Sequence, residues 1–164
     1  MEMAMSKVTY IGADQEFGEA SVFRFREGID PARGTQLNPR FDLRRHSPTG
    51  FAWGYGGSGP AQLSLAILAD LLGNDERALR LYQDFKFKVI GRLPQGERWI
   101  LTEREINEAV AGIEREHGWI WREDARAYED QSLTPDCGWA DGVENVGQLG
   151  PASPALGVGV DSQN

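Results

Sequence analysis

Residues 54–72 read GYGGSGPAQLSLAILADLL, a glycine-rich run that passes directly into a long apolar stretch. Pro60 suits the first turn of a helix, and the residues after it leave almost no polar side. This pattern predicts a central helix over residues 60–72, covered on most sides by other elements. Ser58 is a residue type that favours the N-cap of such a helix.

Strand patterns flank this helix on both sides. Alternation of apolar and polar residues, or a short β-branched and aromatic run between turn residues, marks each of them. The predicted strands are residues 8–11, 21–26, 51–53 and 99–101. The first two form an N-terminal hairpin, with Val22 or Phe23 on its apolar side and Arg24 and Arg26 on the other.

Two further helices are predicted after the central one. Apolar residues at helical spacing indicate a helix over residues 76–91, preceded by Asn74 or Asp75 as a cap. A capping box, Thr102 with Glu105, begins the third helix, which ends near Gly118. We therefore predict an α+β fold in which a small antiparallel sheet packs on three helices.

The charge of the chain is unevenly distributed. Its 164 residues carry a net charge of −8, of which −2 belongs to residues 1–118 and −6 to residues 119–164. The second part also has few clustered apolar side chains, which cannot offset the entropy of ordering it. We predict a globular domain over 1–118 and a mostly disordered acidic tail over 119–164, with an added strand at 119–121 and a helical turn at 125–130.

Composition disfavours several functional classes. The net charge of −8 gives no general attraction to phosphate, so non-specific binding to nucleic acid is not expected. The single cysteine, Cys137, cannot form an intramolecular disulfide, which fits a reducing compartment. No secretory signal is recognisable, and the apolar patch at 63–72 is about half the length needed to cross a bilayer. We expect a cytoplasmic protein with no membrane partner.

The chain offers little for metal or nucleophilic chemistry. Its two histidines, His46 and His117, and one cysteine are too few for a typical zinc centre. Asp42, His46 and Ser47 or Ser58 would supply the residue types of a catalytic triad, but their nearness in sequence is poor support because triads assemble from distant segments. We predict no metal, no cofactor and no catalytic residue.

The segment over residues 46–62 stands out instead. It reads HSPTGFAWGYGGSGPAQ, with four glycines within six positions directly before a helix. The free N–H groups and partial positive charge at a helix N-terminus favour anions. However, no lysine follows the glycines and the spacing is G-x-G-G-x-G, so neither the Walker pattern nor the dinucleotide fingerprint is met. Two interpretations stay open: a cradle for an anion or partner, and a sharp architectural turn.

Arginines and aromatic residues lie close to these glycines in sequence. Arg40, Arg44 and Arg45 precede the run, and Arg77, Lys88 and Arg92 follow roughly one face of the second helix. Arginines folded over the turn would form a bidentate anion site beside aromatic rings. Such a site suits a nucleotide or a stretch of single-stranded nucleic acid. The alternative is an ordinary solvated face. The candidate ligand- or partner-binding residues are Arg44, Arg45, His46, Trp53, Tyr55, Gly56, Gly57, Ser58, Gly59 and Gln62.

The same segment carries a resemblance to a known family. Residues 54–63, GYGGSGPAQL, preceded by HSPTGF at 46–51 and followed by Leu79, Tyr82, Phe85 and Lys86, resemble a family of small uncharacterised proteins, domain of unknown function 6166. The resemblance covers about residues 8–112. It implies an origin in bacteria, bacteriophages or mobile elements, and it carries over no activity and no catalytic residue.

Two functional hypotheses follow. The first is a non-enzymatic binding or interaction module of bacterial or phage origin, which acts on a host protein or a defence component and contacts its protein partner through the glycine-rich turn and adjoining arginines. The second is a small nucleotide- or anion-binding enzyme or sensor that uses the same turn at a helix N-terminus.

Overall fold

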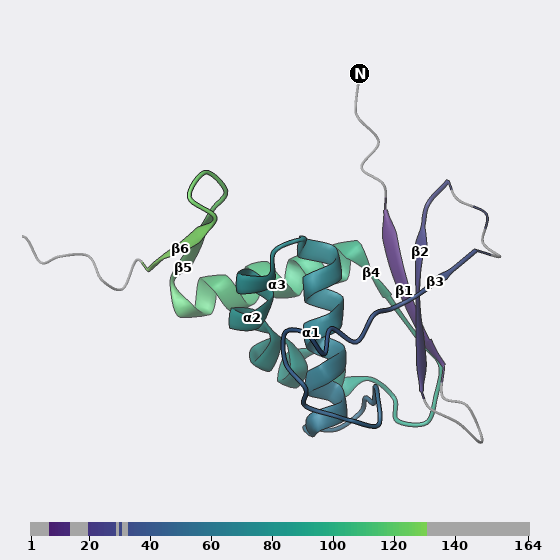
Figure 1. The fold of residues 1–164 in the computed structure, drawn as a ribbon. Helices are drawn as coiled ribbons and strands as arrows, with labels where there is room; N and C mark the ends of the chain where they lie inside the picture. Colours follow the sequence, from purple (N-terminus) through teal and green to yellow (C-terminus); the bar gives the residue numbers. More distant parts are fainter. Residues whose placement is uncertain (1–6, 14–19, 29, 31–32, 131–164) are drawn as a thin grey trace, which may run out of the picture. The chain divides into compact units, whose positions relative to one another are not determined.

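The computed structural model describes residues 7–13, 20–28, 30 and 33–130 (Figure 1). All of them belong to the first of two units into which the chain divides, residues 1–133 and 134–164. The predicted disorder of residues 131–164 therefore falls outside the described part. The elements are β1 (Val8–Ala13), β2 (Ser21–Arg26), β3 (Thr35–Gln36), α1 (Ser58–Leu72), α2 (Asp75–Lys88), the 3-10 turn η1 (Ile90–Arg92), β4 (Trp99–Thr102), α3 (Glu103–His117), β5 (Trp119–Arg122) and β6 (Ala127–Asp130).

The predicted α+β class is confirmed. Strands β1 to β4 form an antiparallel sheet in the order β3-β2-β1-β4, with the first hairpin at its centre. The three helices lie on one side of this sheet (Figure 1). Residues 51–53, predicted as a strand, contribute only one isolated bridge, from Phe51 to Ala20.

The two faces of the sheet differ in burial. On β1, Val8, Tyr10 and Gly12 are buried against the helices, while Thr9 and Ile11 point to the other face and remain partly exposed. This alternation follows from the two-residue period of a strand.

The face on which Arg24 lies differs from the one predicted for the hairpin. Because alternate residues of a strand share a face, Arg24 lies on the same side as buried Val22 rather than opposite to it. There its Nε lies 3.0 Å from Asp70 Oδ2 of α1, an ion pair whose angles are not those of a hydrogen bond. The hydroxyl of Tyr10 donates to the same carboxylate at 2.5 Å. A polar cluster thus joins the sheet to α1, and Phe23 and Phe25 face outward.

Helix α1 is the centre of the core, as its apolar circumference predicts. Residues 59–69 are all buried, and α1 packs most extensively against α2. Gly73 ends the helix in the left-handed conformation, and its N–H donates to the carbonyl of Ala69. Within the described residues, no helix has both the length and the apolar character that a membrane span requires.

The ends of α2 and α3 follow their capping signals. The Asn74 side chain accepts a hydrogen bond from the N–H of Arg77, and the capping box of Thr102 and Glu105 is complete. Helix α2 ends at Lys88, earlier than the predicted residue 91, because the chain tightens into η1. The N–H of Gly54 donates to the carbonyl of Ile90 at 3.1 Å, which ties the glycine-rich turn to this tightened segment.

Residues 119–130 lie beyond the domain boundary predicted at residue 118, and they form a second, two-stranded sheet. The strand expected at 119–121 is present as β5, whereas the helical turn expected at 125–130 is wrong: residues 127–130 form β6 and pair with β5. Strand geometry places Trp121 opposite Tyr128, where the two rings make an edge contact.

This hairpin is held to the helices through Glu114 of α3. The carboxylate accepts hydrogen bonds from Arg77 Nη2 and from the Tyr128 hydroxyl, each at 2.8 Å. Burial, and then this hydrogen bond, raise the pKa of Tyr128 above its ordinary value. The guanidinium of Arg80 lies 4.4 Å from the centre of the Trp119 ring, a cation–π contact.

We expect Glu114→Ala to loosen the hairpin without unfolding the rest. The change leaves Arg77 and Tyr128 partly buried without their acceptor, which costs about 2 kcal/mol. Hydrogen exchange of the β5 and β6 amides should become markedly faster. Glu116→Ala is the matched control, because Glu116 forms an exposed ion pair with Lys88 and its loss should change little. Equal exchange rates of the β5 and β6 amides in the two variants would show that Glu114 does not anchor the hairpin.

Candidate functional site

The glycine-rich turn enters α1 earlier than predicted. Gly54 has φ +83°, and Gly57, in an extended conformation, is the N-cap residue. Ser58, expected at the N-cap, is instead the first helical residue, and no side chain caps this end. Pro60 then falls in the first turn, where a missing N–H costs no intrahelical hydrogen bond.

Close contacts explain most of the glycines. A Cβ at Gly57 would lie 2.2 Å from the ring of Tyr55, and one at Gly59 would lie 2.5 Å from the Cβ of Ala52. At Gly54 the nearest atom would be the Cβ of Gln95, at 2.7 Å. Distances this short are not found between real carbon atoms, so a side chain at Gly54 or Gly59 would require a shift of its neighbours, and one at Gly57 would displace the Tyr55 ring. This observation supports the architectural interpretation for the inner side of the turn.

The outer side of the turn carries two exposed aromatic rings. Tyr55 is 45% exposed and Phe87, on α2, is 58% exposed. The rings border adjoining glycines, since a Cβ on Gly56 would lie 3.0 Å from Phe87. Sequence analysis missed Phe87, although an aromatic residue outside the apolar stripe of α2 is a signal that could have found it.

Gln62 is fully buried one turn into α1 and supports the preceding loop. Its Oε1 accepts from the backbone N–H of His46 at 2.8 Å and of Ser47 at 3.4 Å. Its Nε2 donates to the carbonyls of Pro39 at 2.5 Å and Arg44 at 3.0 Å. Gln62 therefore has no surface for a ligand, and it positions the segment that carries the arginines.

Lys86 adds a positive charge beside the same loop, close enough to the His46 ring to act on its pKa. The His46 ring lies 5.3 Å from that of Tyr82, and its Nε2 is buried without a hydrogen-bond partner. Lys86 is only 7% exposed and its Nζ lies 4.0 Å from the centre of the Phe87 ring. Burial, and then the charges of Arg44 and Lys86, lower the pKa of His46. In the described part of the chain, no carboxylate forms an ion pair with Lys86.

We expect His46 to make the protein less stable as the pH falls. Its pKa in the folded state lies below the ordinary value near 6.5, so below that pH the unfolded chain binds a proton that the folded protein excludes. The free energy of unfolding should therefore decrease from pH 7 towards pH 5. His46→Gln, which does not titrate, should flatten this part of the profile. Urea unfolding at several pH values measures the free energy of unfolding of the wild type and of His46→Gln. Parallel pH profiles for the two proteins would contradict the assignment of this pH dependence to His46.

The remaining candidate residues divide between surface and interior. Arg44 and Arg45 are exposed; Arg44 Nη1 donates to the Tyr82 hydroxyl at 3.4 Å, and the Arg45 guanidinium lies 5.3 Å from the Phe41 ring. Trp53 is buried and makes an edge contact with Trp99, with ring centres 5.6 Å apart. Together, the exposed members of the candidate set are Arg44, Arg45, Tyr55, Gly56 and Ser58.

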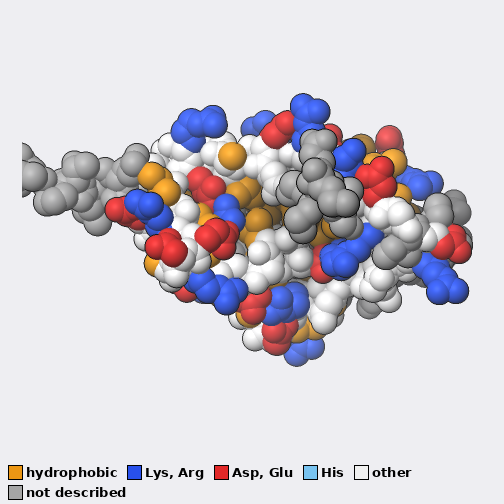
Figure 2. Space-filling model, turned by 90° about the horizontal axis from the view of Figure 1, so that it is seen from above, with side chains coloured by type: hydrophobic (Ala, Val, Ile, Leu, Met, Phe, Trp, Pro, Cys, Tyr) orange, Lys and Arg blue, Asp and Glu red, His pale blue; other side chains and the backbone are white. Residues whose placement is uncertain are grey.

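Arg40 and Arg77, also considered from the sequence, are paired with acids. Arg40 binds both Asp42 and Asp75, with its Nη2 3.0 and 2.8 Å from their carboxylates, and Arg77 binds Glu114. Basic and acidic side chains are interspersed over the face seen in Figure 2, with no broad area of one charge. Among the described residues, no three His, Cys, Asp or Glu side chains gather where they could hold a metal ion.

Comparison with known proteins places the chain in a family. The model of a family of unknown function, DUF6166, matches residues 20–112. The chain belongs to this family. No curated protein and no solved structure matches it significantly. The matched region of this DUF6166 member contains the glycine-rich turn, Gln62 and Lys86, and it ends within α3, before the β5–β6 hairpin.

Proposed function

We propose that this DUF6166 member is a non-enzymatic binding module that contacts a protein partner through the outer side of its glycine-rich turn. The contact surface, here called the turn surface, consists of Arg44, Arg45, Tyr55, Ser58 and Phe87. The observation that carries the proposal is the pair of exposed rings, Tyr55 and Phe87, bordering adjoining glycines of a closely packed turn.

Aromatic residues and arginines are the residue types that contribute most of the binding energy at protein interfaces. Such residues bury a large area on binding while losing little conformational freedom. The backbone before Tyr55 is tied to η1, because the N–H of Gly54 donates to the carbonyl of Ile90, and Phe87 sits on α2. The surface is therefore ordered before a partner arrives, which lowers the entropic cost of association.

The partner class that we propose comes from the resemblance noted in the sequence. A bacterial, phage or mobile-element setting makes a host protein or a defence component the partner, and the protein would act in the cytoplasm. The positive groups around the turn, Arg44, Arg45 and Lys86, favour a partner with acidic residues at its contact.

Affinity capture from bacterial lysate tests this proposal. The Phe87→Ser and Arg45→Glu variants, used as baits, should each recover at least tenfold less partner protein than the wild-type chain does. Arg104→Glu is the matched control for Arg45→Glu and should retain the partner, because Arg104 is exposed on α3 and is not part of the turn surface. Equal recovery with wild type and both turn-surface variants would overturn the proposal.

An anion or nucleotide is the second candidate ligand, favoured by a specific observation. His46 Nε2 is buried without a partner beside the cations Arg44 and Lys86, and the first turn of α1 lacks a capping side chain. A bound anion would accept from such groups and screen their repulsion. A small enzyme or a sensor would use the site in the same way.

Thermal unfolding with sulfate and with a panel of nucleotides tests the second candidate. A ligand that binds only the folded state raises the Tm with increasing concentration. Lys86→Met should abolish the rise, and Arg104→Met, an exposed change on α3, should preserve it. No rise at millimolar concentrations would remove the anion candidate and leave the protein-binding proposal standing.

A further inference from the structure

The face of the sheet turned away from the helices is apolar at its centre. Ile11 on β1, Phe23 and Phe25 on β2 and Ile100 on β4 share this face by register, because Ile11 lies opposite both Phe23 and Ile100. No described helix covers it (Figure 1). The two phenylalanines are partly exposed and Ile100 is 56% exposed. An amphipathic sheet that leaves apolar residues uncovered on its second face is a typical site of association.

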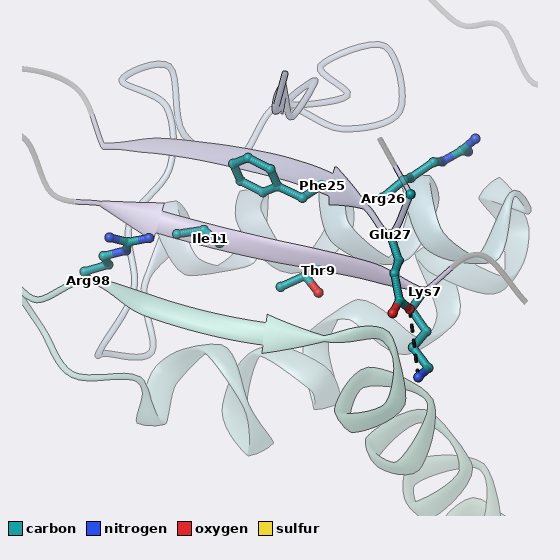
Figure 3. A pocket seen from close by; sticks show the side chains of 8 residues that line it. Lys7, Thr9, Ile11, Phe25, Arg26, Glu27 and Arg98 are labelled. Atoms are coloured by element: carbon teal, nitrogen blue, oxygen red, sulfur yellow. Dashed lines mark ion pairs between the residues drawn. The ribbon is translucent and has the colours of Figure 1, made fainter. Parts of the chain in front are cut away.

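A pocket of about 660 Å³ lies on this face (Figure 3). Thr9, Ile11 and Phe25 form its floor, with the Phe25 ring lying over the strands. Gly34 allows the ring this position, since a Cβ there would lie 2.5 Å from it. The pocket is open to solvent, which suits side chains of a partner laid on the sheet better than a small molecule that must be enclosed.

The rim of the pocket is predominantly basic. Arg98 stands at one end, and Lys7 and Glu27 stand at the other, while the side chain of Arg26 points away from the floor (Figure 3). Lys7 pairs with Glu27 at 3.8 Å, and both side chains are largely exposed. Within the described residues, no ion pair involves Arg26 or Arg98. Two cations, Lys7 and Arg98, and one carboxylate thus surround an apolar floor.

This charge pattern distinguishes between possible occupants. In a symmetric dimer the same patch would face itself, which would set the net positive rim of one copy against the same rim of the other. Like charges placed together across an interface oppose association. A partner with carboxylates around an apolar centre matches the rim instead.

We propose that this outer sheet face binds an amphipathic helix of another protein, with apolar residues seated on Ile11, Phe25 and Ile100 and flanking carboxylates paired with Lys7 and Arg98. A helix is the element that covers a sheet face in layered folds. The surface shares no residue with the turn surface, so it would give the module a second contact with one partner or a contact with a second partner.

Two synthetic helical peptides of about 18 residues test the assignment. Both carry the same leucine stripe; one is flanked by glutamates and the other by lysines. On titration into the full chain, the glutamate peptide should shift the backbone resonances of residues 9–11, 23–26 and 98–101 in a saturable way. The double variant Lys7→Glu, Arg98→Glu should weaken this binding at least tenfold, and the lysine peptide should bind at least tenfold more weakly than the glutamate peptide.

The control and the contrary outcomes are as follows. Arg45→Glu, on the turn surface, should leave the affinity for the glutamate peptide unchanged, which separates this proposal from the proposed function. Equal affinity for the two peptides, or shifts confined to residues 54–58 and 87, would overturn the assignment. A dimer that sedimentation detects and that Ile100→Asp dissociates would also overturn it, by making a second copy the occupant.

Discussion

Replacing Gln62 by leucine is expected to destabilise the protein by about 3–4 kcal/mol, although leucine matches glutamine closely in size. The change removes an acceptor from two backbone N–H groups, of His46 and Ser47, and a donor from the carbonyls of Pro39 and Arg44. Each buried group left without a partner costs about 1–3 kcal/mol, and only outward movement of the loop relieves it. Urea unfolding measures the loss.

Gln83→Leu is the matched control for this experiment. Gln83 is exposed on α2, so the same chemical change should alter the free energy of unfolding by less than about 0.5 kcal/mol. Hydrogen exchange should also become faster at residues 44–47 in the Gln62 variant alone. A Gln62→Leu protein as stable as the control would mean that the loop does not depend on this side chain.

Replacing Gly12 by alanine is expected to cost about 3 kcal/mol, despite the small size of the added methyl group. The new Cβ would lie 2.2 Å from Cε2 of Trp99, inside the indole ring, and Trp99 is buried. Gly12 is not in the left-handed region, so the whole cost is steric. Trp99 in turn contacts Trp53 at the start of the turn, and displacement of Trp99 should therefore reach the turn surface.

A double-mutant cycle separates this clash from other effects. Trp99→Leu removes the atoms that the new methyl group meets, so the double variant should be more stable than the sum of the two single changes predicts, by about 1–2 kcal/mol. Ala13→Val is a control on the neighbouring strand position, whose side chain is partly exposed on the opposite face. Additive effects of Gly12→Ala and Trp99→Leu would contradict the steric account.

Local signals made most of the fold predictable. The unbroken apolar circumference of α1, the Asn74 cap and the Thr102–Glu105 box each depend on residues a few positions apart, and the three helices that they predict are present. The start of α1 was displaced by two residues because Gly57, not Ser58, is the N-cap. That choice depends on how Gly59 packs against Ala52, a contact no local pattern contains.

Features that depend on distant residues were not predictable. Arg24 is drawn to the helix side of the sheet by Asp70, and residues 127–130 form a strand in a hairpin held by Glu114 and Arg77. Neither partner can be inferred from the strands alone. Both features place a polar or charged group where a periodic pattern indicates otherwise.

The candidate site was predictable only in part. The sequence located the turn and its arginines, but it could not separate residues that face outward, such as Tyr55, from those that support them, such as Trp53 and Gln62. Exposure depends on which elements cover the turn. The same limitation hid Phe87, whose ring approaches Gly56 from another helix.

Site-specific photo-cross-linking in bacterial cells tests the central claim most directly. A photoreactive phenylalanine analogue would replace Tyr55, Phe87 or, as a control, Glu108, which is exposed on α3. Our account predicts that positions 55 and 87 form a cross-link to the same partner, that Arg45→Glu abolishes it, and that position 108 forms none. Cross-links of equal yield from position 108, or none from positions 55 and 87, would contradict it.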